Sequence, residues 1–99
     1  MDSGIREMVD ALEEARRQLR ENALPKVREL REPVAVGGEH HLLGPAADLL
    51  AALAELLGGV EPRVTSSQAH HAHFEAAKRL QEQAGYLRGR QQEIRGLTG

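Results

Sequence analysis

The chain has 99 residues, of which 40% are hydrophobic and 28% charged, and its formal net charge is −2. This length allows one domain, and this balance is typical of a globular chain rather than a disordered one. The sequence has no cysteine, which excludes disulfides, thiolate zinc sites and cysteine nucleophiles. It also has no tryptophan. One Phe and one Tyr disfavour a reader of single-stranded nucleic acid, which stacks bases on aromatic rings.

The first helix is predicted over residues 4–31. Apolar residues recur there at steps of three and four, which places them on one helix face; they are Ile5, Val9, Leu12, Leu19, Ala23, Val27 and Leu30. Pro25 lacks a backbone N–H and crowds the preceding turn, so we expect a kink around Glu21–Leu24. The helix should end before Pro33, because proline disfavours helical geometry at the residue that precedes it.

A connector is predicted over residues 33–44, because Gly37 and Gly38 favour a turn. The second helix is expected over 46–57, with Pro45 at its first position. Its apolar residues form a wide stripe, which predicts burial on more than one side; they are Ala46, Leu49, Leu50, Leu53, Leu56 and Leu57.

Two interpretations of Gly58–Pro62 remain open. In the first, the chain breaks or bends strongly there and a third helix covers 63–95. In the second, the apolar pattern continues through the glycines as one helix over 46–95, which would be about 75 Å long. The first helix is too short to cover such a stripe, so the break is favoured. The fold class is therefore all-α: a small helical bundle or helical hairpin, with one helical domain over 1–99.

Histidine is the one over-used reactive residue, at His40, His41, His70, His71 and His73. His70 and His73 are three residues apart, and His71 and Glu75 four, so each pair can place two ligands of Zn²⁺ or Ni²⁺ on one helix face. The alternative is a set of surface histidines with His71 at a helix contact, where protonation would make association sensitive to pH. A metal- or pH-responsive regulator is thus one alternative function, although no full ligand set predicts a metal.

No pattern in the chain predicts catalysis or a bound cofactor. Ser66 and Ser67 are the only hydroxyls near the histidines, and both are better explained as helix-start residues. Glu13 and Glu14 are flanked by arginines, which is typical of a solvated helix face rather than of an acid–base pair. We therefore expect a protein that is not an enzyme.

Arginines gather near the C-terminus, at Arg88, Arg90 and Arg95. A helix that reads nucleic acid normally carries denser, one-sided basic charge, and Glu93 interrupts this group. A small DNA-associated protein is therefore a further alternative and not the favoured one.

No segment typical of targeting or of membrane insertion is found. The first ten residues carry Asp2, Arg6 and Glu7 and lack the apolar stretch of a signal peptide. The most apolar run, Leu42 to Val60, is interrupted by acidic residues and is too polar to cross a bilayer as a free helix. We expect a cytoplasmic protein without a membrane partner, whose export would need a route without a cleaved signal peptide.

Leu42-Leu43-Gly44 stands near the middle of this cysteine-free chain. In length and in this motif the chain resembles the Trp-x-Gly family of small type VII secretion substrates, with Leu in place of Trp. The resemblance implies a helical hairpin that turns at 42–44, pairs with itself or with another helical chain, and acts as a secretion substrate or a chaperone-like partner. The family's export signal, a Tyr followed four residues later by Asp or Glu, is not matched, because Arg90 follows Tyr86.

The amphipathic helices carry the strongest signal in the sequence. Because a small core with few large side chains is often completed by a partner, they predict a protein–protein interaction module that self-associates or pairs with another helical chain. The residues expected to form its core or to contact its partner are Leu12, Leu19, Leu42, Leu53, Leu57, Phe74 and Leu87.

Overall fold

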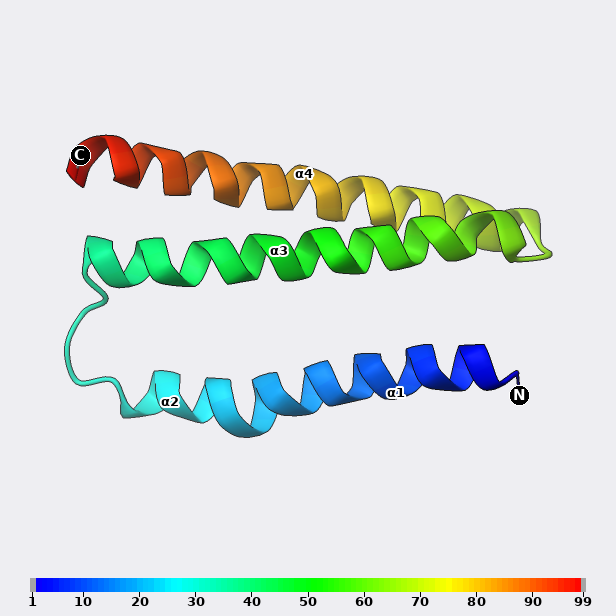
Figure 1. Ribbon diagram of the computed structural model, residues 1–99, viewed down its shortest axis with the longest axis horizontal. Helices are drawn as coiled ribbons and strands as arrows, with labels where there is room; N and C mark the ends of the chain where they lie inside the picture. The colour runs from blue at the N-terminus through cyan, green and yellow to red at the C-terminus, as the bar shows by residue number, and fades with distance from the viewer. Residues whose placement is uncertain (1, 99) are drawn as a thin grey trace. The chain divides into compact units, whose positions relative to one another are not determined.

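The computed structural model describes residues 2–98, and within this range it is all-α, with helices and no strand (Figure 1). This confirms the predicted fold class. Contacts within the chain divide it into two compact units, Met1–Pro33 and Val34–Gly99. A single domain over 1–99 remains a prediction, and each unit is described by itself.

The first unit is one helical rod that consists of α1 (Ser3–Gln18), a π-helical segment η1 (Leu19–Ala23) and α2 (Leu24–Glu29). Asp2 caps its start, because the Asp2 Oδ1 atom accepts hydrogen bonds from the backbone N–H groups of Gly4 at 2.7 Å and Ile5 at 3.3 Å. The rod ends at Glu29, and its C-cap Leu30 has an extended ψ of 128°. The helix therefore ends before Pro33 as predicted, two residues short of the predicted end at residue 31.

The irregularity predicted around Glu21–Leu24 takes the form of the π-helical segment η1. In a regular α-helix residue 25 would donate to the carbonyl of residue 21, and Pro25 has no N–H to donate. The chain instead makes a wider turn, in which the Leu24 N–H bonds to the Leu19 carbonyl, five residues earlier. This turn accommodates one extra residue and therefore removes the need for the bond that proline cannot make.

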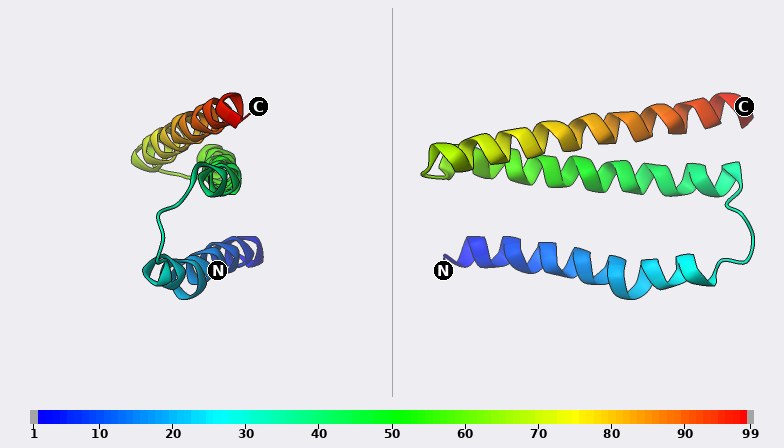
Figure 2. Two further views of the ribbon diagram at one scale, coloured as in Figure 1. Left: turned by 90° about the vertical axis from the view of Figure 1, so that its left-hand side faces the viewer. Right: turned by 180° about the vertical axis from the view of Figure 1, so that it is seen from behind.

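The second unit is an antiparallel hairpin of α3 (Val36–Val60) and α4 (Ser67–Thr98), joined by a 3₁₀ turn η2 (Glu61–Arg63). Figures 1 and 2 show from several sides that the two helices run next to each other. The predicted break is confirmed, although α3 passes through both glycines and ends at Val60. The last helix begins at Ser67 rather than at 63, and the Ser66 Oγ atom accepts from the Ala69 N–H at 3.0 Å.

The connector predicted over 33–44 is wrong for most of its length. α3 begins at Val36, so Gly37 and Gly38 lie in its first turn and Pro45 lies inside the helix. The second helix is therefore much longer than the predicted 46–57. The turn expected at Leu42–Gly44 is absent for the same reason, since these residues are helical.

Contacts with α4 explain why the start of α3 is helical against its local signals. The Arg90 side chain donates to the Glu39 carboxylate, and the Gln91 Nε2 atom donates to the His40 carbonyl. Each glycine in a helix costs about 1 kcal/mol relative to alanine. Tertiary contacts along this stretch offset that cost, as they do in most helices of folded proteins.

Small side chains form the seam between α3 and α4. The most buried residues of the chain are Ala47, Ala54, Ala84 and Ile94, at 0–2% exposure. The helices also approach closely beside Gly44, where an added Cβ atom would lie 2.9 Å from the Gln91 Nε2 atom. Alanine seams bring helix backbones near each other, but each alanine buries little apolar area.

The seam positions recur every seven residues in both helices. On α3 and the first residue of η2 they are His40, Ala47, Ala54 and Glu61, and on α4 they are His70, Ala77, Ala84 and Gln91. The Gln91 Nε2 atom lies 3.3 Å from the His40 carbonyl at one end, and the His70 Nδ1 atom lies 3.0 Å from a Glu61 carboxylate oxygen at the other. In this antiparallel register, two alanine layers lie between two polar layers. If one helix shifted along the other by one layer, polar side chains would lie opposite alanines. The polar end layers therefore specify the register of the two helices.

Candidate functional site

A second apolar stripe runs along α3 and is separate from the seam with α4. We call it the outer stripe; it consists of Leu42, Ala46, Leu49, Leu53, Leu56 and Val60, at alternating steps of four and three. Leu42 is 63% exposed and Leu49 is 45% exposed. A helix with apolar residues on two faces is normally buried on both. In the hairpin Leu42, Ala46 and Leu49 of the outer stripe are exposed, whereas Leu53, Leu56 and Val60 are half-buried.

Acidic residues follow one side of the outer stripe. Around the helix, Ala52 and Gly59 come next to the outer stripe, and Asp48 and Glu55 follow on the far side of these small residues. All four residues are exposed. Residues 34–62 contain no Lys or Arg. Asp48 accepts from Arg88 of α4 at 3.3 Å, whereas Glu55 has no ion pair within the described residues. A partner helix on the outer stripe would therefore meet an acidic border.

The first unit also presents an apolar stripe, which we call the N-terminal stripe; its members are Ile5, Met8, Leu12, Ala15, Leu19, Ala23, Val27 and Leu30. Its leucine, isoleucine and valine side chains are exposed, from 42% at Ile5 to 61% at Val27, and Met8 is half-buried. A lone amphipathic helix cannot bury its own stripe, and helices in proteins owe most of their stability to such burial. The stripe is therefore a surface that needs a cover.

The seven residues predicted for the core or partner surface fall into two groups. Leu53, Leu57 and Leu87 are half-buried within the hairpin. Leu12, Leu19, Leu42 and Phe74 are 42%, 47%, 63% and 59% exposed, respectively. The exposed four are candidates for partner contact rather than for the hairpin core. Their role in partner binding remains a prediction.

Charged contacts hold the open end of the hairpin. The Arg90 guanidinium donates to both Glu39 carboxylate oxygens, at 2.6 and 2.9 Å, and also to Glu93 at 3.4 Å. The hydrogen bonds from Arg90 lower the pKa of Glu39 below its ordinary value of 4.5, and the same bonds raise the pKa of Arg90. This bidentate pair connects residues 51 positions apart and so specifies how the two helices align. Sequence reasoning missed it, because neither residue stands out locally.

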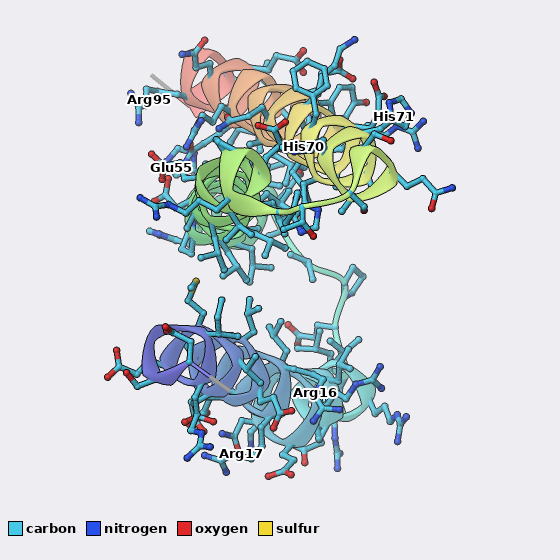
Figure 3. The ribbon with its side chains drawn as sticks, turned by 90° about the vertical axis from the view of Figure 1, so that its right-hand side faces the viewer. Arg16, Arg17, Glu55, His70, His71 and Arg95 are labelled. Atoms are coloured by element: carbon cyan, nitrogen blue, oxygen red, sulfur yellow. The ribbon has the colours of Figure 1, made fainter. Side chains whose placement is uncertain are left out.

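The histidines do not converge on one point. His70 lies toward α3, where it meets Glu61, and its neighbour His71 lies on the other side of α4 (Figure 3). The His73 Nδ1 atom is 2.7 Å from the Ala69 carbonyl, within its own helix, and Glu75 is in ion-pair range of Arg79. Among residues 2–98 no group of three or more His, Cys, Asp or Glu side chains is placed to hold a metal ion.

His40 and His41 lie at the start of α3, with ring centroids 5.9 Å apart and edge to face. The His40 Nδ1 atom is buried and has no hydrogen-bond partner in the structure described here. His40 meets Gln91 at one end of the hairpin, whereas His70 meets Glu61 at the other end. The histidines of α3 and those of α4 therefore do not form one cluster.

Two of the three C-terminal arginines serve the hairpin. Arg88 pairs with Asp48 and Arg90 with Glu39, so their charges are directed at α3. A nucleic-acid surface would need these groups for phosphate contacts. The geometry therefore gives no specific support to the alternative of a DNA-associated protein.

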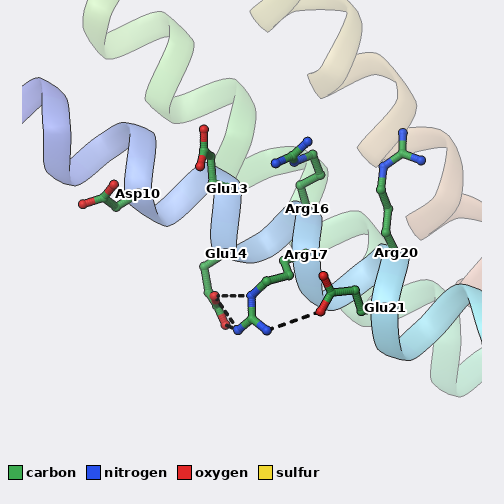
Figure 4. A pocket seen from close by; sticks show the side chains of 7 residues that line it. All are labelled: Asp10, Glu13, Glu14, Arg16, Arg17, Arg20 and Glu21. Atoms are coloured by element: carbon green, nitrogen blue, oxygen red, sulfur yellow. Dashed lines mark hydrogen bonds and ion pairs between the residues drawn. The ribbon is translucent and has the colours of Figure 1, made fainter.

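A shallow charged depression lies on α1 and η1, lined by Asp10, Glu13, Glu14, Arg16, Arg17, Arg20 and Glu21. Arg17 donates to Glu14 at 2.6–3.0 Å and to Glu21 at 3.5 Å, whereas Arg16 and Arg20 point to another side (Figure 4). The hydrogen bond from Arg17 lowers the pKa of Glu14. Every lining residue is exposed, and the depression offers no enclosed volume for a substrate.

One helix in the described residues, Val36–Arg63, is long and apolar enough to cross a membrane by length and composition alone. The mean hydropathy of its best window is 1.5, and 11% of that window is buried. Core helices of soluble proteins pass the same test, so the expected absence of a membrane partner remains a prediction. The low burial of this helix reflects the exposed residues of its outer stripe.

No protein-family model matches the chain, and comparisons with curated proteins and with solved structures also give no match. The resemblance to small type VII secretion substrates therefore remains a prediction.

Proposed function

We propose that the protein is a non-enzymatic helical interaction module, which self-associates or pairs with another helical chain through the outer stripe of α3. The observation that carries this proposal is the doubly apolar character of α3. Its seam face is closed by α4, whereas Leu42 and Leu49 on the outer stripe are 63% and 45% exposed. Soluble proteins rarely leave a long contiguous apolar surface uncovered unless it binds something.

The hairpin provides a rigid base for such a surface. Its polar end layers and the Glu39–Arg90 pair align α3 against α4, so the outer stripe is presented on a helix of fixed register. Heptad spacing in the seam is the pattern of a coiled coil with an alanine core. In this proposal α3 belongs to two helix contacts at once, one within the hairpin and one with a partner.

A single substitution in the outer stripe tests the proposal. In Leu49→Glu a carboxylate would have to be buried in any contact made by this stripe, which is costly. We expect the solution mass, measured by light scattering over a range of concentrations, to fall toward the 10.9 kDa chain mass, with at least a tenfold loss of association. Tyr86→Glu is the matched control, since Tyr86 is an isolated apolar residue of α4 at 74% exposure.

A fluorescent dye that binds exposed apolar surface completes the experiment. If the wild-type chain stays at the monomer mass and also binds no dye, the outer stripe is not available and the proposal fails. A monomer whose dye binding falls in Leu49→Glu but not in Tyr86→Glu supports pairing with a different helical chain. Circular dichroism on the same samples shows that each variant keeps its helices.

A further inference from the structure

The outer stripe of α3 is poorly suited to pair with itself. An antiparallel two-fold contact between two α3 helices brings the same border of each helix together. Here that border carries Asp48, which pairs with Arg88 of α4, and Glu55, which has no ion pair within the described residues; residues 34–62 themselves contain no Lys or Arg. Like charges brought together at an interface weaken it and oppose the pairing. The outer stripe therefore favours a partner helix whose border is basic.

The N-terminal stripe has the length and continuity that such a partner needs. Ile5, Leu12, Leu19 and Val27 follow one another at steps of seven, seven and eight residues. The step of eight falls on η1 (Leu19–Ala23), whose wide turn accommodates one extra residue. The π-helical segment thus keeps the stripe in phase along the rod, as insertions do in long helical pairs. The stripe spans 26 residues and the outer stripe 19, so the rod can cover the whole of the outer stripe.

Basic residues border the N-terminal stripe on one side. Arg6, Arg20 and Arg28 recur there at steps of fourteen and eight residues, and Arg16 lies beside them. Glu13 is the one acidic residue in this series. Arg16 and Arg20 point away from the Glu14–Arg17–Glu21 group (Figure 4), and neither has an ion pair within the described residues. These arginines are available to a partner.

We propose that the outer stripe of α3 is covered by the Ser3–Glu29 rod of a second copy of this chain, in a two-fold symmetric dimer that makes this contact twice. The two stripes are both apolar and unpartnered, and their borders carry opposite charge. Ala52 and Gly59 are small, so the long arginine side chains of the rod can extend past them to Glu55. This inference rests on the proposed function and names the partner.

Two charge reversals test the proposal in the full chain. Glu55→Arg sets arginine against the basic border, and Arg20→Glu sets glutamate against the acidic border. Because each reversal occurs twice in the dimer, we expect about a tenfold loss of dimer affinity for either variant alone. Both residues are exposed, so circular dichroism should show unchanged helix content. Lys78→Glu on the exposed surface of α4 is the control and should leave the affinity unchanged.

Mixing the two variants distinguishes contact between copies from other arrangements. In a mixed dimer each rod meets a border of opposite charge, so an equimolar mixture of Glu55→Arg and Arg20→Glu should regain dimers of wild-type affinity. A chain that carries both reversals should do the same with itself. Sedimentation equilibrium measures all four samples.

Three outcomes would overturn the inference. A wild-type chain that remains at the monomer mass excludes a second copy as the occupant. Variants that are each weakened but are not restored by mixing exclude exchange of rods between copies. Dimers that respond to Leu49→Glu but not to either charge reversal leave the proposed function intact and show that another surface covers the outer stripe.

Discussion

The two units of the chain differ in how they use the same kind of helix. In the hairpin, α3 and α4 close on each other along buried alanines, and ion pairs join residues far apart in sequence, such as Glu39 and Arg90. In the Ser3–Glu29 rod no described residue is buried, and the ion pairs among its described residues join positions three or four apart. The hairpin is specified by tertiary contacts, whereas the rod is specified locally.

This difference teaches that apolar periodicity alone does not define a core. The larger leucines and valines of the rod are mostly exposed, while the most buried positions of the chain are three alanines and one isoleucine. Burial follows from how closely two helices approach, and small side chains permit the closest approach. Many of the large residues, such as Leu12, Leu42 and Leu49, instead lie on exposed surfaces.

The largest expected effect comes from Ile94, the one large side chain that is fully buried, at 1% exposure. Ile94→Ala should lower the free energy of unfolding by about 2–5 kcal/mol, because it removes buried methyl groups and leaves a cavity. Leu97→Ala, three residues later and 74% exposed, should change it by about 0.5 kcal/mol or less. Urea unfolding followed by circular dichroism measures both.

Leu12→Ala extends the same test to the rod. Leu12 is 42% exposed, so at low protein concentration its truncation should cost much less than that of Ile94. An equal cost for the two variants would break the comparison, because it would mean that the rod has a closed core of its own.

Two glycine-to-alanine substitutions in the hairpin should have smaller effects on its stability. One should stabilise the hairpin, and the other should not. Gly85→Ala lies in α4 with nothing near its added Cβ atom, so the gain in helix propensity should stabilise the hairpin by about 0.5–1 kcal/mol. In Gly44→Ala the Cβ atom meets the Gln91 Nε2 atom at 2.9 Å. That side chain must move and lose its hydrogen bond to His40, which offsets the gain. Equal melting temperatures for the two variants would show that the Gln91 side chain moves away from the added Cβ atom at no cost to the hairpin.

Much of the fold could be predicted from the sequence because its signals are local and agree with one another. Apolar steps of three and four predict the helices. Pro62 lies in the break between α3 and α4, although the helix passes through Gly58 and Gly59, and Pro25 predicts the irregular turn in the rod. In each case a backbone property of the residue itself decides the outcome.

The remaining features depend on contacts between distant residues, which local signals do not contain. Gly37 and Gly38 predict a turn, yet they lie in a helix because α3 gains contacts with α4 there. The alanine seam was missed because hydrophobic patterns weight leucine above alanine. The signal was nevertheless present, since Ala47 and Ala54 on α3, and Ala77 and Ala84 on α4, are each seven residues apart.

The candidate surfaces were predictable only in part, for a related reason. Periodicity identified Leu12 and Leu19 as members of one apolar stripe and Leu53 as a member of another. It could not separate the face of α3 that meets α4 from the face that stays exposed, because both faces are apolar. That distinction requires the register of the hairpin, which the polar end layers and the Glu39–Arg90 pair specify.

The smallest expected effect is an acid dependence of the contact between α3 and α4. Arg90 lowers the pKa of Glu39 below 4.5 in the folded chain, so the pair stabilises the hairpin fully above that pH. The stabilisation is lost as the pH falls through the lower folded-state pKa, because the carboxylate is then protonated. The difference in melting temperature between wild type and Glu39→Gln should thus be constant from pH 7 to 5 and shrink below pH 4.5.

Glu14→Gln is the matched variant in the rod, where Arg17 also lowers the pKa of the carboxylate. This pair joins residues of one exposed helix, so its loss changes no alignment between helices, and exposed pairs of this kind stabilise little. The melting temperature of the hairpin should therefore be the same in Glu14→Gln as in the wild type at every pH. Parallel pH profiles for wild type and Glu39→Gln would instead mean that the Glu39–Arg90 pair does not hold the hairpin together, and alanine packing alone would have to set its register.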